Sequence, residues 1–152
     1  MMRLTIIAVG RHKAGPLKAL QEFYAGRIRW PLTVREVEER RKLPPAELKA
    51  REAELILAAL PKDAVLIALD ARGKNLSSAD FAARLARWRD ADASLAFVIG
   101  GADGLADSIV HEATLVLALG AMTWPHLLVR GMLLEQLYRT QQILAGHPYH
   151  RE

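Results

Sequence analysis

Apolar residues along the chain fall into short continuous runs that have the length of β-strands. Continuous apolar runs of this length are typical of strands buried on both faces, as in a parallel sheet. Four runs are rich in Val, Ile and Leu, and the one at Leu32–Val37 is weaker. The five expected strands cover residues Arg3–Val9, Leu32–Val37, 64–69, 95–99 and 114–119.

Helical periodicity fills the segments between these runs, and proline and capping residues mark where the helices begin. Pro16, Pro45 and Pro125 are placed at helix starts, where a missing N–H costs no hydrogen bond. Ser77 stands three residues before an acidic side chain, a spacing that favours a helix N-cap. The expected helices cover residues 16–30, 44–60, 78–88, 105–112 and 125–145.

Strands that alternate with helices predict an α/β fold, with a mostly parallel sheet covered by helices on both faces. Hydrophobic residues make up 51% of the chain and charged residues 25%, as in an ordinary globular protein. No linker, repeat or low-complexity tract divides the sequence. Residues 1–152 are therefore expected to form a single domain.

The composition also bears on the cellular compartment. The chain has no cysteine, which excludes disulfides, thiolate zinc sites and cysteine nucleophiles, and fits a reducing compartment. The first twenty residues show no apolar core of a secretory signal. The longest uncharged stretch, residues 113–129, is interrupted by Gly120, Thr123 and Pro125 and is a poor membrane span. We expect a cytoplasmic protein without a membrane partner.

Charge is distributed unevenly along the chain. Residues 1–42 contain ten Lys and Arg against four Glu, whereas residues 43–112 contain eight against eleven acidic residues. A basic first quarter on a nearly neutral body indicates a positive face that could meet phosphates. The alternative is an ordinary solvated surface on a basic protein.

Three of the strong runs end in loops of unusual composition, at residues 69–73, 100–104 and 119–124. Gly100, Gly101 and Gly104 supply three glycines within five residues, which allows the backbone to approach a ligand closely. Ligands of open α/β sheets bind beyond the carboxyl ends of the strands. The three loops together predict a nucleoside-sized pocket, although a glycine after a single strand is more often just a turn.

A nicotinamide dinucleotide is a poor candidate for this pocket. Its fingerprint needs three glycines at fixed spacing in the first strand-to-helix turn, and residues 10–15 (GRHKAG) lack that spacing. Asp103 would also repel a pyrophosphate, whereas a cationic cofactor without phosphates tolerates a nearby carboxylate. This argues against a dinucleotide-dependent oxidoreductase.

Four segments resemble one known family over the whole chain. They are AVGRHK near the start, LDARGK at 69–74, FVIGGADG at 97–104, and MTWPHLLVRGMLLEQLYRTQQILAGHPYHRE from residue 122 onwards. The chain resembles the bacterial ribosomal RNA large subunit methyltransferase H family, which is a minimal branch of the SPOUT superfamily. The last segment is the most specific, because a match of thirty-one residues is improbable by chance.

The resemblance implies a homodimer with a C-terminal trefoil knot that holds S-adenosylmethionine in a bent form. It also implies methylation of the third ring nitrogen of a pseudouridine, in the helix-69 loop of 23S rRNA within the assembled 70S ribosome or large subunit. Many relatives carry serine at Gly120 and glutamate at Asp103, so a hydroxyl hydrogen bond is lost here and the carboxylate is shorter. The positions implied to contact the cofactor are Leu69, Gly100, Leu119, Gly120, Ala121, Met122, Thr123 and Trp124.

Methyl transfer requires donor and acceptor in line, and the imide nitrogen must lose one proton. The cofactor supplies the reactive group, so no metal is expected. His126 and Arg130 lie four residues apart, which places them on one helix face, where they could orient RNA or the deprotonated ring. Equally, His126 could simply help to cap the helix. The candidate catalytic residues are His126, Arg130, Tyr149, His150 and Arg151.

The polar tail, HPYHRE, could be frayed or functional. Terminal disorder is common, but Tyr149 could stack on a base, and in the family the tail reaches into the partner's cofactor site. Glu135 and Arg139, four residues apart, are expected to form a surface or interface ion pair. His147 and His150 lack acidic or cysteine partners, so metal binding there is not expected.

Two functions from different classes follow. The first is an S-adenosylmethionine-dependent rRNA methyltransferase, and the alternative is a catalytically inactive, ribosome-associated RNA-binding module of the same fold. The basic surface is small and poor in stacking aromatics, so affinity for free RNA is expected to be weak and salt-dependent.

Overall fold

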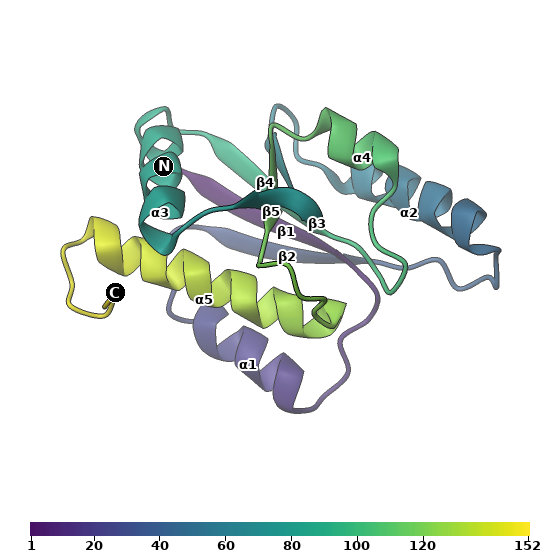
Figure 1. Cartoon of the computed structure of the whole chain (residues 1–152), viewed down its shortest axis with the longest axis horizontal. Helices are drawn as coiled ribbons and strands as arrows, with labels where there is room; N and C mark the ends of the chain where they lie inside the picture. The colour runs from purple at the N-terminus through teal and green to yellow at the C-terminus, as the bar shows by residue number, and fades with distance from the viewer.

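The five apolar runs form one parallel sheet in a computed structural model that describes residues 1–152. The strands follow the spatial order β2-β1-β4-β3-β5, and every neighbouring pair is parallel (Figure 1). The prediction of a mostly parallel α/β sheet is confirmed. The strands are β1 (Arg3–Val9), β2 (Leu32–Val37), β3 (Val65–Asn75), β4 (Ser94–Ile99) and β5 (Leu115–Ala118).

Helices cover both faces of the sheet, as expected from the apolar character of the strands on both sides (Figure 1). One face carries α1, α3 and α5, and the opposite face carries α2 and α4. The long α5 packs against both α1 and α3. The helices are α1 (Pro16–Ala25), α2 (Pro45–Ala59), α3 (Ser78–Asp90), α4 (Asp107–Glu112) and α5 (His126–Leu144).

Two separate cores result from the alternation of side chains along the strands. Ile6, Phe97 and Ile67 are in register on β1, β4 and β3 and belong to the core on the α5 side. The next residue along each of these strands belongs to the core on the α2 side. Burial of both faces in this way explains why the central strands are apolar without interruption.

Strand β3 is longer than predicted. The segment at residues 70–73, expected to be a loop, is part of β3, and the pairing with β5 shifts register between Leu69 and Lys74. Gly73 is needed there, because a β-carbon at this position would collide with the backbone of Val116 on β5. The prediction failed because polar residues were taken to end a strand. Beyond Leu69, β3 pairs with β5 and no longer with β4, and a segment that is paired on one side only can carry polar side chains.

Several helix ends also differ from the prediction. Helix α1 ends at Ala25, and not just before Pro31, because Gly26 caps it and its N–H bonds back to Glu22. Helix α5 begins at His126, with Pro125 as the preceding N-cap residue. No helix combines the length and apolar character needed to cross a bilayer. The trefoil knot implied by the resemblance stays a prediction.

Candidate functional site

The three segments predicted as loops, of which the first is part of β3, converge at the carboxyl edge of the sheet and enclose a hollow of about 250 Å³. The start of α5 closes it on one side with His126 and Val129. The prediction that these loops share one pocket is confirmed. Seven of the eight residues implied to contact the cofactor line this hollow, and Ala121 lies in the same loop without lining it: Leu69, Gly100, Leu119, Gly120, Met122, Thr123 and Trp124.

The loop after β4 is held in a tight turn. Gly104 donates its N–H to the carbonyl of Gly101 at 3.0 Å and adopts φ 81°, in the region that favours glycine. A β-carbon on Gly100 would lie 2.7 Å from the carbonyl carbon of Gly104, closer than packing allows. The backbone of this loop can therefore face a ligand without side chains in between.

The loop after β5 is fixed by two hydrogen bonds to its ends. Gly120, at φ 94°, donates its N–H to the Asn75 side chain at 3.0 Å. The indole N–H of Trp124 donates to the carbonyl of Leu119 at 2.9 Å and closes the loop on itself. Met122 and Trp124 remain 73% and 40% exposed at its tip. The loop therefore presents a preformed backbone wall with apolar side chains at the mouth.

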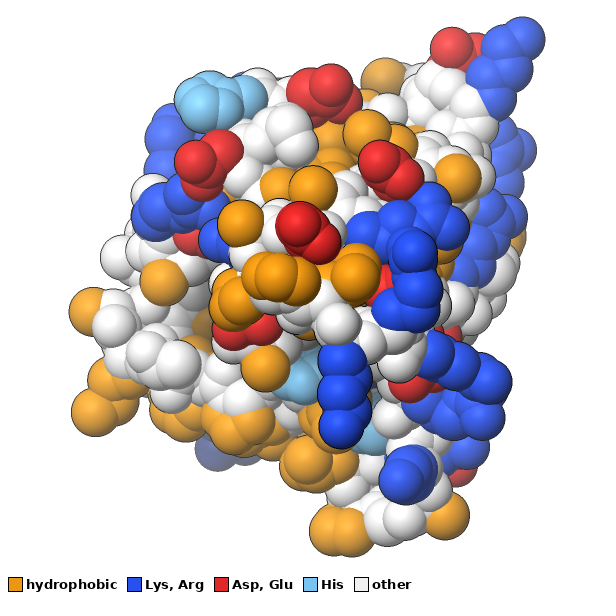
Figure 2. All heavy atoms as spheres, turned by 90° about the vertical axis from the view of Figure 1, so that its right-hand side faces the viewer, with side chains coloured by type: hydrophobic (Ala, Val, Ile, Leu, Met, Phe, Trp, Pro, Cys, Tyr) orange, Lys and Arg blue, Asp and Glu red, His pale blue; other side chains and the backbone are white.

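Charges around the rim are balanced rather than uniformly basic. Figure 2 looks onto this edge of the molecule, where apolar side chains gather centrally, acidic ones lie around them, and lysines and arginines gather mainly along one margin. Arg72 pairs with Asp70 at 2.9 Å and with Asp107 at 2.7 Å. Hydrogen bonds from Arg72 lower the pKa of Asp70, so this carboxylate stays ionised at the wall of the hollow.

His126 lies at the hollow, whereas Arg130 does not. His126 lines the wall and is half-buried, and its Nδ1 has no hydrogen-bond partner. Arg130 is only 1% exposed and pairs with Glu36 at 2.5 Å. It also donates to the carbonyl oxygens of Val9 and Gly10 at 3.2 and 2.9 Å. The expected pair of RNA-facing side chains is thus divided, because the Arg130 side chain is held at the carboxyl ends of β1 and β2.

The tail folds back on the second half of α5. The Tyr149 hydroxyl donates to Glu135 at 3.0 Å, and the Tyr149 ring meets Tyr138 edge-on at 4.9 Å. His150 Nδ1 lies 3.1 Å from the Arg139 guanidinium, and the expected ion pair of Arg139 with Glu135 is confirmed at 2.6 Å. Burial and the contact with Glu135 raise the pKa of Tyr149.

The tail and the hollow are therefore separate within one chain. Glu135 lies nine residues beyond His126 along α5, which corresponds to about 14 Å along the helix axis. The structure brings His126 to the hollow but leaves Tyr149, His150 and the exposed Arg151 beside the second half of the helix.

Two charged groups near the site were not singled out by sequence. Glu36 forms an ion pair with Arg130, which is 94 positions away in the sequence, and no local sequence pattern predicts such a pair. Glu52 on α2 is 8% exposed and lies behind the loop after β4, within reach of Gly101. Burial raises the pKa of Glu52, and the nearby Asp103 adds to this. The only sequence signal for Glu52 was an acidic residue on the apolar face of an amphipathic helix.

Comparison with known proteins places the chain among methyltransferases. A family model described as "Predicted SPOUT methyltransferase" matches residues 2–150. The chain is 61% identical to the ribosomal RNA large subunit methyltransferase H of Rhodospirillum centenum and 54% identical to that of Paramagnetospirillum magneticum. Each alignment covers 99% of both chains.

Solved structures share the fold at low sequence identity. The SpoU methyltransferase AviRb from Streptomyces viridochromogenes, in complex with AdoMet, has a TM-score of 0.50 at 14% identity, covering 93% of this chain and 58% of its own. A structure solved for the 2-OH methylation of C/U34 on tRNA has a TM-score of 0.51 at 21% identity, covering 96% and 98%. The chain belongs to the ribosomal RNA large subunit methyltransferase H family of the SPOUT methyltransferases.

Proposed function

We propose that the protein transfers a methyl group from S-adenosylmethionine to ribosomal RNA of the large subunit. The observation that carries this proposal is the hollow of about 250 Å³ where β3 meets the loops after β4 and β5, in a chain 61% identical to a named rRNA methyltransferase. When bound, S-adenosylmethionine supplies an activated methyl group. The protein's part is to bind it, orient it and manage one proton.

The loops suit a nucleoside with a cationic sulfur. Backbone N–H and C=O groups of Leu69, Gly100 and residues 119–124 would hold the adenosine, since the glycines leave the backbone uncovered. The ionised Asp70 at the wall favours a positive charge nearby. The chain has no group of three side chains able to hold a metal ion, and the proposed chemistry needs none.

The finer target is a pseudouridine in the helix-69 loop of 23S rRNA, methylated at its third ring nitrogen in the 70S ribosome or large subunit. Full-length similarity to the methyltransferase H relatives supports this target. The chain as a single domain of residues 1–152 has a small basic surface. Recognition would therefore depend on the shape of the assembled ribosome, in the cytoplasm, rather than on tight binding to free RNA.

A homodimer would complete the site. The tail residues Tyr149, His150 and Arg151 lie away from the hollow of their own chain, so they would serve the hollow of a second copy. An apolar groove of about 610 Å³ between α1, α3 and α5 supports such an interface, and Phe23 on α1 is 49% exposed nearby. Light scattering in solution should then give twice the mass of 16.8 kDa.

The decisive experiment is methyl transfer to ribosomes from cells lacking the enzyme, followed by mass spectrometry of the helix-69 loop. One methyl group on the pseudouridine, together with calorimetric binding of S-adenosylhomocysteine, is the expected result. Binding of ribosomes without methyl incorporation would favour the inactive RNA-binding module instead. Absence of binding to both S-adenosylmethionine and S-adenosylhomocysteine would overturn the proposal.

A further inference from the structure

One ion pair near the wall of the hollow has a buried arginine, Arg130, and a partly exposed partner, Glu36, whose side chain is 37% exposed. The guanidinium of Arg130 is 1% exposed and pairs with Glu36 of β2. Glu36 Oε2 also accepts the backbone N–H of His12 at 2.8 Å, and His12 Nδ1 lies 2.8 Å from Gln21. One carboxylate thus ties the start of α5 to β2 and to the loop after β1.

His126 contacts the same backbone segment as this ion pair. A β-carbon at Gly10 would lie 3.4 Å from His126 Cε1 and 3.9 Å from Arg130 Nη2, so these two atoms lie within about 7 Å of each other. Arg130 holds the carbonyl oxygens of Val9 and Gly10. The position of the imidazole at the hollow therefore depends on a segment that Arg130 anchors.

The charges around His126 come from every element packed against it. Arg130 lies on the same helix, His12 follows β1, Glu36 belongs to β2, and Asp70 on β3 lines the same hollow. Burial lowers the pKa of His126, and the charges of Arg130 and then His12 lower it further, while the nearby backbone of Val9 opposes them. His126 Nδ1 is buried without a partner, which also disfavours a doubly protonated ring.

We infer that the Glu36–Arg130 pair is a positioning unit that fixes His126 at the hollow as a neutral imidazole, able to accept the proton of the target imide nitrogen. This inference rests on the proposed methyl transfer. Arg130 and Glu36 act through His126 and do not touch the RNA base.

The proton and electron pairs balance without any further reactant. The imide N–H bond breaks, and its proton passes to the lone pair of the His126 imidazole. The nitrogen forms a bond to the methyl carbon, the carbon–sulfur bond breaks, and its electron pair stays on sulfur. The imidazolium then returns its proton to water. A neutral ring at pH 7 is the form that this step needs.

Opposite charge changes in the pair separate this role from a structural one. Arg130→Met removes a positive charge and should raise the pKa of His126 by at least about 0.5 unit, whereas Glu36→Gln removes a negative charge and should lower it. Arg130→Lys keeps the charge and should leave the pKa near its wild-type value. Loss of packing alone would not shift the pKa in opposite directions.

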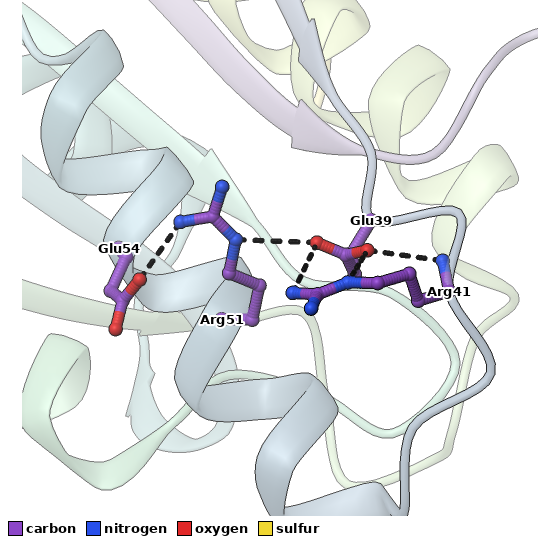
Figure 3. Close-up of polar contacts among 4 residues, drawn as sticks. All are labelled: Glu39, Arg41, Arg51 and Glu54. Atoms are coloured by element: carbon purple, nitrogen blue, oxygen red, sulfur yellow. Dashed lines mark hydrogen bonds and ion pairs between the residues drawn. The ribbon is translucent and has the colours of Figure 1, made fainter.

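A second ion pair provides matched controls. Figure 3 shows Arg51 and Arg41 meeting Glu39, and Arg51 also meeting Glu54, on the exposed side of α2. Arg51 pairs with Glu39 at 3.2 Å through its Nε. Arg51→Met and Glu39→Gln repeat the two charge changes away from His126. Neither should move the pKa of His126.

The experiment is imidazole NMR titration of the full-length protein, with the His126 signal assigned by its loss in His126→Gln. The acidic limb of the pH profile for methyl transfer to ribosomes is recorded with the same variants. We expect the pKa of His126 to shift in opposite directions in Arg130→Met and Glu36→Gln. The acidic limb of the pH profile should shift in the same direction as this pKa in each variant. If the pKa of His126 does not change, or changes in the same direction in both variants, the inference is overturned. It is also overturned if the pKa of His126 shifts and the acidic limb of the pH profile does not.

The two readouts also keep the proposals apart. If the titration shifts as expected but wild-type protein transfers no methyl group to ribosomes, the proposed function fails along with the proton step. If methyl transfer occurs and the titration does not respond, only the positioning unit fails. If Arg130→Met does not fold, Glu36→Gln decides alone, because looser packing would expose the imidazole and raise the pKa of His126, whereas loss of the negative charge lowers it. If Glu36→Gln does not fold, the difference between Arg130→Met and Arg130→Lys decides.

Discussion

Single residues decide whether the hollow exists, and Gly100 is the clearest case. A β-carbon there would lie 2.7 and 2.9 Å from the carbonyl carbon and oxygen of Gly104. Gly100→Ala should therefore displace the loop after β4 and weaken S-adenosylhomocysteine binding by about tenfold or more, measured by calorimetry. Gly26→Ala, where the nearest atom is at 3.3 Å and the site is distant, is the control. Equal affinity in both variants would contradict a role for this turn.

Arg72 offers a test by pH at the same scale. Its hydrogen bonds lower the pKa of Asp70 below the ordinary value of 3.8 for an aspartate. The folded state thus releases this proton more readily than the unfolded chain, and the resulting stability is present above pH 4 and lost as the pH falls through the lowered value. Arg72→Met should cost less than about 1 kcal/mol at pH 7, because Arg72 is half exposed.

Urea unfolding of wild type and Arg72→Met at pH 7 and at about pH 2.5 checks this expectation. The difference in the free energy of unfolding should shrink at the lower pH, because Asp70 and Asp107 take up protons as the pH falls and Arg72 loses its charged partners. A difference that stays the same at both pH values would show that Arg72 stabilises by packing and not through its charge.

At the scale of elements, α5 holds the molecule together. It packs on α1, α3 and the sheet, and Leu134 at its middle is completely buried. Leu134→Ala should lower the free energy of unfolding by about 2–5 kcal/mol, because a cavity would remain in the core on this face of the sheet. Leu57→Ala on α2, where the side chain is 39% exposed, should cost much less. Comparable losses in chemical denaturation would contradict this view of the core.

At the scale of the whole molecule, the separation of tail and hollow predicts complementation between subunits. His126→Gln damages the hollow and Tyr149→Ala damages the tail, so each homodimer alone should be poorly active. After unfolding and refolding together, half of the dimers would be mixed, each with one intact composite site. Methyl transfer should recover to about one quarter of the wild-type rate.

The subunit-mixing experiment has a clear opposite outcome. If each chain uses its own tail, mixing restores nothing, because every site then carries one damaged residue. Tyr138→Phe, which leaves the aromatic contact with Tyr149 in place, is a control whose activity should not require mixing.

Sequence pattern by itself determined the parallel sheet and the convergence of residues 69–71, now within β3, with the loops after β4 and β5. Continuous apolar runs report burial on two faces, and parallel strands bring their carboxyl ends to one edge, so both follow from local composition. The extension of β3 through residues 70–75 did not follow, since it depends on pairing with β5 across a register shift.

Only the tertiary structure decided which polar side chains meet. Helical spacing placed His126 and Arg130 on one face, but whether that face meets solvent or the sheet depends on how α5 docks. Docking buried Arg130 against Glu36, a partner 94 positions away, and left His126 at the hollow. A contact between residues so distant in sequence produces no periodic pattern in the sequence. Such a contact is fixed by how whole helices and strands pack, and not by the neighbouring residues in the chain.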